Sequence, residues 1–262
     1  MAGISAIFNC GNFQLRQFPI TVIFKPYALL TLFNRYIIGK EVYMIIDFVS
    51  SALIEIDVQN DFCPGGALAV EHGDEVTDPL NRLAFLFSAH GGRVIATQDW
   101  HDANHISFAS SHPGKKPGDI IDLPLVKQQV LWPDHCVKGT KGANFHKDLD
   151  MYLVHLIVRK GYRQELDSYS AFFENDRTTP TGLNGFLKGL GIKSVFLGGL
   201  ATDYCVFYGA MDAVNHGFET YVLRDAVRGV GFPEGSIDKA FETMEQAGIQ
   251  IIDSGDIEGE SP

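Results

Sequence analysis

Ser51-Ala-Leu-Ile-Glu-Ile-Asp-Val58 is a near-continuous run of β-favouring residues. Such a run is typical of a strand that is buried on both faces, as strands of a parallel sheet are. Further strands are predicted at 93–97, 156–159, 193–198, 220–223 and 249–252. Helical periodicity is found between them, at 76–90, 180–190, 203–216 and 236–247. This alternation predicts a Rossmann-like three-layer α/β sandwich, with a mainly parallel six-stranded sheet and helices on both faces.

The overall composition excludes several classes of protein. The chain has 262 residues, 45% of them hydrophobic, and a formal net charge of −11. It is therefore neither disordered nor fibrous in character. An acidic chain lacks the basic surface that binds a phosphate backbone, so we expect no nucleic-acid partner. Because 4 cysteines in a chain of this length do not make a disulfide scaffold, a reducing compartment is favoured.

The amino-terminal residues differ from the remainder. Residues 1–40 are rich in Phe, Ile and Leu and contain four basic residues but no acidic one. Lys25 and Arg35 interrupt the apolar runs before they reach the roughly 20 residues that a membrane span needs. We expect a cytoplasmic protein without a membrane span, and organelle targeting by this segment is the alternative. The predicted division is an N-terminal extension of unknown role (1–44), one α/β domain (45–255) and a C-terminal tail (256–262).

Side chains that suit a metal ion follow the second predicted strand. Asp99 and His101 are two positions apart, so in an extended segment both project to the same side. His135 lies in the same long loop, which spans residues 100–150. One carboxylate and two imidazoles, with other positions open, are typical of a catalytic metal site. His105 is a further candidate ligand or a partner behind the ligands, and the alternative is that these are solvated loop histidines.

Three other predicted strands lead to residues that can perform covalent chemistry. Asp57 follows the first strand, Lys160 ends the third, and Cys205 follows the fourth. In a parallel sheet these carboxyl ends meet at one edge. Cys205 would lie in the first turn of a helix, where free amides and the helix dipole favour a thiolate. A Cys, an Asp and a Lys in one cleft point to acyl transfer, whereas a capping carboxylate, a solvated lysine and a buried thiol are the alternatives.

Six motifs in this order resemble the nicotinamidase branch of the isochorismatase-like cysteine hydrolases. They are Asp57-Val-Gln-Asn-Asp-Phe-Cys-Pro-Gly-Gly66, Gln98-Asp-Trp-His101, Trp132-Pro-Asp-His-Cys136, Lys160-Gly161, Asp167-Ser-Tyr-Ser-Ala-Phe172 and Gly199-Leu-Ala-Thr-Asp-Tyr-Cys205. The resemblance covers roughly residues 51–253. Each motif alone is unspecific, and their combination in one order is what identifies the family.

The resemblance implies a set of site residues. The catalytic triad would be Asp57, Lys160 and Cys205, and one divalent metal ion would be held by Asp99, His101 and His135. Zinc is expected, with iron or manganese as alternatives. A ligand role for His105 is left open, because members of the family differ in this loop.

The resemblance also implies a substrate pocket and a reaction. Phe62, Trp132 and Tyr169 match positions of an aromatic pocket, and a cis peptide before Ala201 would turn its amide, with that of Cys205, toward an oxyanion. The substrate would be nicotinamide, hydrolysed to nicotinate and ammonia in NAD salvage through a cysteine thioester. The alternatives are a related hydrolase of another amide or of isochorismate, and a catalytically silent metal- or partner-binding protein. A homo-oligomer is left open.

Overall fold

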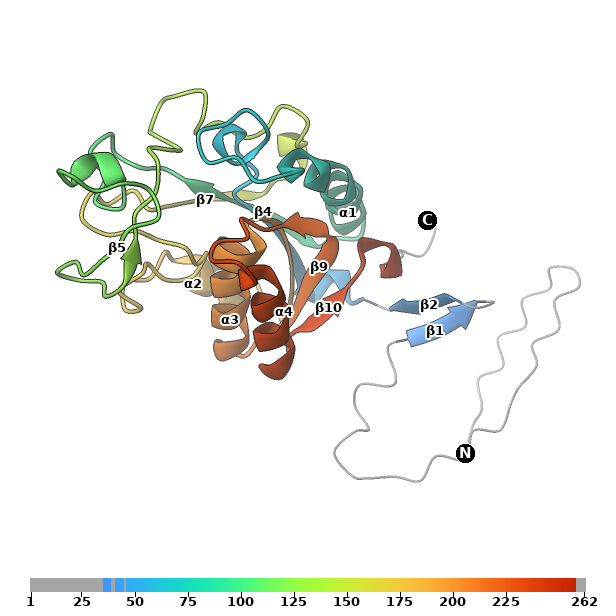
Figure 1. The fold of residues 1–262 in the computed structure, drawn as a ribbon. Coiled ribbons are helices and arrows are strands. Elements are labelled where there is room, and N and C mark those ends of the chain that lie inside the picture. The colour runs from blue at the N-terminus through green and yellow to red at the C-terminus, as the bar shows by residue number, and fades with distance from the viewer. Residues whose placement is uncertain (1–34, 39–40, 45, 258–262) are drawn as a thin grey trace, which may run out of the picture. The chain divides into compact units, whose positions relative to one another are not determined.

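A parallel sheet of six strands is the centre of the fold (Figure 1). The structure, a computed structural model, describes residues 35–38, 41–44 and 46–257. The strand order is β10–β9–β8–β3–β4–β7, and every neighbouring pair is parallel. The strands are β3 (Ser51–Ile56), β4 (Arg93–Asp99), β7 (Leu156–Lys160), β8 (Ser194–Leu200), β9 (Glu219–Arg228) and β10 (Gln250–Ile252). All six predicted strands are present.

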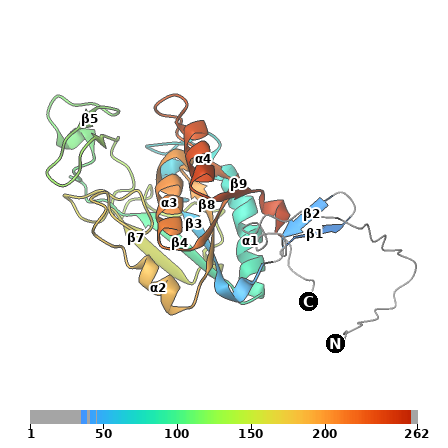
Figure 2. The same ribbon diagram turned by 90° about the horizontal axis from the view of Figure 1, so that it is seen from below.

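Helices cover both faces of this sheet, which confirms the predicted α/β fold (Figure 2). Helix α1 (Thr77–Ala89) packs on one face, and α2 (Leu183–Gly189), α3 (Phe207–Asn215) and α4 (Ser236–Gln246) pack on the other. The central strand β3 is buried on both sides. Leu53 belongs to the apolar cluster that includes Leu80 of α1, whereas Ile54 belongs to the cluster that includes Ala210 of α3.

Two helices begin differently from the prediction. The helix expected over 180–190 begins only at Leu183, after Gly182 in a left-handed conformation (φ 100°). Pro180 pairs instead with Phe173 in an antiparallel bridge, so the chain before Leu183 is extended. The helix expected from 203 begins with a π-helical turn, Thr202–Val206, and continues as α3.

Shorter elements surround the main sheet. Two antiparallel hairpins are formed by β1 (Arg35–Ile38) with β2 (Glu41–Met44), and by β5 (Ile120–Ile121) with β6 (Gln129–Val130). The 3-10 turns are Phe48–Ser50, Asn60–Phe62, Gly73–Val76, Ala109–Ser111, Met151–Leu153 and Ser254–Asp256. Met44 is buried and forms a parallel bridge with Ile257. Most of the predicted extension, and most of the predicted tail, lies outside the described residues.

The order of the strands shows where a site can form. From β3 the chain proceeds to β4 and β7 on one side of the sheet, and β8, β9 and β10 lie on the other side. The order therefore reverses between β3 and β8, and ligands of such sheets bind beyond the carboxyl ends of the strands at that point. Among the described residues, no helix is both long and apolar enough to traverse a bilayer.

Candidate active site

Asp57 is the first residue beyond β3 and is fully buried. Its backbone is in the left-handed region (φ 49°), which turns the chain sharply at the end of the strand. Thr97 of β4 holds the carboxyl group, because its hydroxyl donates to Oδ1 of Asp57 at 2.6 Å and accepts from the Asp57 amide at 3.1 Å. The second oxygen, Oδ2, lies 2.7 Å from Nζ of Lys160. Asp57 is therefore fixed by one neutral and one charged partner.

Lys160, the last residue of β7, is buried completely and extends into the site. It stands opposite Asp99 in the register between β4 and β7. Besides Asp57, its Nζ contacts Oδ1 of Asp99 at 2.5 Å, the carbonyl oxygen of Ser168 at 2.9 Å and Sγ of Cys205 at 3.4 Å. The predicted acid, lysine and thiol are thus brought together at one edge of the sheet.

The electrostatics of these groups follow from burial and from Lys160. Burial raises the pKa of Asp57 to about 6, against the lowering effect of the lysine. Burial lowers the pKa of Lys160, but the carboxylates of Asp57 and Asp99 outweigh it and raise this pKa well above its usual value. Lys160 is therefore a permanent cation, whereas Asp57 can exchange a proton near neutral pH.

Cys205 lies in the π-helical turn before α3 and is almost fully buried, with 6% of its surface exposed. Burial raises the pKa of its thiol well above the usual value, even though Lys160 acts to lower it. Burial therefore works against the thiolate that the helix terminus was expected to favour. The position beside the helix start is as expected, but desolvation of the charged sulfur dominates. This thiol needs a proton acceptor before it can act as a nucleophile.

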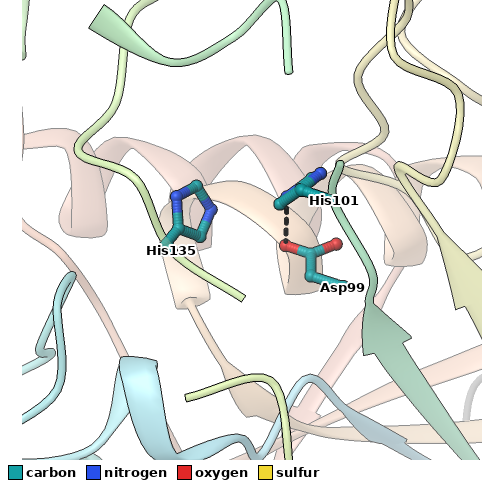
Figure 3. A group of neighbouring side chains, drawn as sticks. All are labelled: Asp99, His101 and His135. Carbon is teal, nitrogen blue, oxygen red and sulfur yellow. Dashed lines mark ion pairs between the residues drawn. The ribbon is translucent and has the colours of Figure 1, made fainter. Parts of the chain in front are cut away.

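Asp99, His101 and His135 form a second cluster next to these residues (Figure 3). One ligand atom from each lies within 4.8 Å of the others, and all three side chains are buried. Oδ2 of Asp99 and Nε2 of His101 are 3.6 Å apart. Nδ1 of each histidine ring forms a hydrogen bond with a backbone carbonyl. Nδ1 of His101 is 2.8 Å from the carbonyl oxygen of Gly161, and Nδ1 of His135 is 2.7 Å from the carbonyl oxygen of Pro133.

This arrangement fits a metal ion. Within the described part of the chain, the buried Nε2 of His101 has no hydrogen-bond partner. Burial lowers the pKa of His135 to about 4, so its ring is neutral at pH 7 and can act as a ligand. A backbone carbonyl next to Nδ1 of each imidazole would favour the tautomer whose Nε2 is free to bind a metal ion. Two imidazoles and one carboxylate suit Zn²⁺ or another first-row divalent ion, with further positions open.

His105 is placed differently from the other candidate ligands. Its ring lies against that of His101, with the centroids 4.3 Å apart, but it belongs to a separate cluster with His101 and Asp167. Both of its ring nitrogens have protein partners: Nδ1 is 2.7 Å from the Ser107 hydroxyl and Nε2 is 2.9 Å from the carbonyl oxygen of Arg163. This geometry favours a role in which His105 supports the metal ligands and does not itself bind the metal.

A small cavity of about 30 Å³ opens between the thiol and the metal cluster. Its lining includes all four predicted pocket residues, Phe62, Trp132, Tyr169 and Ala201, together with Cys205, Asp99 and His135. The indole Nε1 of Trp132 donates to the Tyr169 hydroxyl at 3.0 Å, which fixes two of the aromatic walls relative to each other. The peptide bond between Leu200 and Ala201 is cis, as the resemblance implies.

Several supporting residues were not singled out from the sequence. Gln59 bridges the ends of β3 and β4: its side-chain amide donates to the Asp99 carbonyl at 2.8 Å and its Oε1 accepts from the Asp99 amide at 2.8 Å. Asp61 accepts a bond from the Cys136 amide at 2.7 Å and so positions the segment that carries His135. Both lie in the stretch Asp57-Val-Gln-Asn-Asp61, whose density of polar residues directly after a buried strand was the available signal.

The fold and site define a member of a known family of hydrolases. The Isochorismatase domain matches residues 51–256, and the chain belongs to this family and to its nicotinamidase branch. The nicotinamidase of Acinetobacter baylyi is 48% identical over 206 residues, which cover 79% of this chain and 94% of that protein.

Solved structures of similar proteins agree with this assignment. The nicotinamidase/pyrazinamidase of Acinetobacter baumanii is 50% identical with a TM-score of 0.75, covering 79% of this chain and 97% of its own. PnC1 of L. infantum, in complex with nicotinate, is 34% identical with a TM-score of 0.71 and coverages of 83% and 100%. The pyrazinamidase of Pyrococcus horikoshii, in complex with zinc, is 40% identical with a TM-score of 0.63 and coverages of 78% and 99%.

Proposed function

We propose that this protein hydrolyses nicotinamide to nicotinate and ammonia, as a metal-dependent cysteine amidohydrolase of NAD salvage. The observation that carries the proposal is the position of Lys160, which contacts Asp57, Asp99 and Cys205 at once. A buried thiol, a proton acceptor and a cation meet there beside a cluster suited to a metal. Similarity to nicotinamidases over nearly their whole length supports the choice of substrate.

The first step uses the proton affinities of Asp57 and Cys205. With a pKa of about 6, Asp57 is mainly ionised at pH 7, while the buried thiol is protonated. Asp57 accepts the thiol proton, and the sulfur then forms a bond to the carbonyl carbon of the carboxamide. The carbon–oxygen double bond becomes a single bond, and the charge moves to the oxygen. Lys160 remains charged throughout and compensates the negative charge that passes between the sulfur and Asp57.

The backbone near Ala201 would stabilise the oxyanion. The amides of Ala201 and Cys205 belong to the segment that carries the nucleophile, and both residues line the cavity. A well-placed donor of this kind contributes about 3–4 kcal/mol to the transition state. Asp57 then returns the proton to the leaving nitrogen, the carbon–nitrogen bond breaks, and ammonia departs. A thioester between the nicotinoyl group and Cys205 remains.

The second half of the reaction repeats these proton transfers with water. Asp57 accepts a proton from a water molecule as that water attacks the thioester carbon. The carbon–sulfur bond breaks, and the proton on Asp57 returns to the sulfur. The nicotinic acid that is released loses its carboxyl proton to solvent and becomes nicotinate. When bound to Asp99, His101 and His135, a divalent metal supplies a Lewis acid that can hold the ring nitrogen of the substrate. Phe62 and Trp132 would hold the two sides of the ring.

Ammonia release from nicotinamide, with and without a chelator, tests this function. We expect metal-dependent turnover by the native chain and its loss in Cys205→Ala with the metal content unchanged. Cys63→Ala is a matched control, because Cys63 is also buried but does not line the cavity. Turnover by Cys205→Ala at the native rate would contradict the mechanism. Hydrolysis of another amide or of isochorismate, but not of nicotinamide, would favour a related hydrolase, and no hydrolysis of any of these would favour a silent member of the fold.

Several predictions rest on the family and the sequence alone. Zinc is proposed over iron or manganese because the ligand set suits it and a relative was solved in complex with zinc. A cytoplasmic location, and the division into an extension, one domain and a short tail, stay predictions. A homo-oligomer is still left open.

A further inference from the structure

Tyr204 borders both the reaction cavity and a much larger cavity. It lines both the cavity of about 30 Å³ and a neighbouring cavity of about 440 Å³. Among the described residues that line the small cavity, Tyr204 is the one that also lines the large cavity. The large cavity has further aromatic walls, supplied by Phe207, Tyr208 and Phe232. Because both cavities share it, Tyr204 is the candidate for a partition between the two spaces.

This ring is held from three directions. Its centroid lies 4.9 Å from that of the Trp132 indole, and the two ring planes are nearly perpendicular (85°). The ring of Tyr169 lies 5.5 Å away, also in an edge-on arrangement. The hydroxyl donates to the carbonyl oxygen of Phe232 at 2.6 Å. These three contacts restrict the orientation of the phenol ring.

Asp203 forms hydrogen bonds with the loop that contains Phe232, the hydrogen-bond partner of the Tyr204 hydroxyl. Its carboxylate accepts bonds from the amide of Val230 at 2.9 Å, the amide of Gly231 at 3.0 Å and the hydroxyl of Ser236 at 2.5 Å. Val230 lines the small cavity, whereas Ser236 lines the large one. Two successive residues of the π-helical turn, Asp203 and Tyr204, thus form hydrogen bonds with this loop.

We propose that Tyr204 is a specificity-determining residue that restricts the enzyme to small, unsubstituted pyridine carboxamides. The inference rests on the proposed function and extends it to substrate size. Removing the phenol ring joins the reaction cavity to the larger one. A substituent on the substrate ring could then enter the aromatic space beside Phe207 and Phe232.

The test compares the kcat/KM of nicotinamide with those of nicotinamides that carry a phenyl group at ring position 4, 5 or 6. We expect Tyr204→Ala and Tyr204→Leu to raise the ratio of substituted to unsubstituted substrate by about tenfold or more for at least one position, the size of effect that pocket shape supplies. The ratio cancels any general loss of activity. Tyr204→Phe keeps the ring and should keep the native ratio. Phe207→Ala should keep it too, because Phe207 lines the large cavity but not the small one.

The possible results separate the two proposals. If the native enzyme hydrolyses nicotinamide and all three ratios stay unchanged in both ring-removing variants, Tyr204 does not set substrate size. An equal gain in Tyr204→Phe would assign the restriction to the hydroxyl bond instead and would also overturn the partition. If the native enzyme releases no ammonia from nicotinamide, the proposed function itself has failed.

Discussion

Nζ of Lys160 lies 2.5 Å from Oδ1 of Asp99. One lysine therefore joins the group that would perform the covalent chemistry to the cluster that would bind the metal. The two residues are direct neighbours across β4 and β7, so the hydrogen bonds of the sheet hold them together. Their contact also explains two opposite effects, since Lys160 helps to lower the pKa of Asp99 well below its usual value while Asp99 helps to raise that of Lys160.

Replacing the lysine should affect both catalysis and folding. Lys160→Met leaves the buried carboxylates of Asp57 and Asp99 without their cation, and breaking a buried pair typically costs about 3–5 kcal/mol. We expect kcat to fall by about 10³-fold or more in metal-loaded protein, and the urea midpoint to fall with it. Lys127→Met is the control, because Lys127 pairs with Asp122 in an exposed position and should change stability by less than about 1 kcal/mol. Equal effects of both substitutions would refute this account.

The metal content of single variants should distinguish ligands from supporting residues. His135→Ala removes an imidazole whose Nδ1 is already oriented by a carbonyl, so we expect bound metal to fall to a small fraction of one equivalent. His105→Asn removes a ring whose two nitrogens have protein partners, and the bound metal should stay near one equivalent with at most a 10–100-fold weaker affinity. Elemental analysis after dialysis measures both. Equal loss of metal in the two variants would show that His105 is a ligand.

Glu55 should make the protein less stable as the pH rises. Its side chain is fully buried in β3, and neither carboxylate oxygen has a hydrogen-bond partner among the described residues. Burial raises its pKa from 4.5 to about 8. Between these values the unfolded chain releases the proton while the folded chain keeps it, so the free energy of unfolding decreases with pH.

A substitution at this position can isolate the effect. Glu55→Leu removes the titrating group. The free energy of unfolding of the variant, relative to that of the native chain, should therefore rise from pH 5 to pH 8 by an amount on the order of a few kcal/mol. Urea unfolding at pH 5, 6.5 and 8 gives the comparison. Glu71→Leu, at an exposed position with 89% of the side chain accessible, serves as the control and should give a curve parallel to that of the native chain. If the Glu55→Leu curve is parallel as well, the buried carboxyl does not titrate in this range.

A chain that begins at Met44 should keep its activity. The catalytic and metal-binding groups all come from residues 57–205, and Met44 itself retains its bridge to Ile257. We expect kcat/KM for nicotinamide within about twofold of the full chain, a change smaller than 1 kcal/mol. Circular dichroism and metal analysis would establish that the shortened protein is folded and loaded. Loss of activity in such a sample would assign the first 43 residues to the active unit.

The sequence was sufficient for the order of the elements and for the identity of the strand-end residues. Buried parallel strands are continuous apolar runs, and their ends are marked by the first polar residues, so Asp57, Asp99 and Lys160 could be located by pattern alone. The turn that contains Cys205 and the start of α2 were harder to predict from the sequence. Both depend on how the chain packs against neighbouring segments, as the bridge between Phe173 and Pro180 shows.

Relations across the sheet were decided by the tertiary structure alone. Residues 57, 99, 160 and 205 are far apart in the chain, and only the strand order β8–β3–β4–β7 places them at one edge. The protonation of Cys205 also depends on the fold, because burial of the sulfur and its distance from Lys160 set its pKa in opposite directions. The fold also decides that Tyr204 lines two cavities. The sequence by itself determined which groups are present, whereas packing determined their contacts and hence their charge states and the space around them.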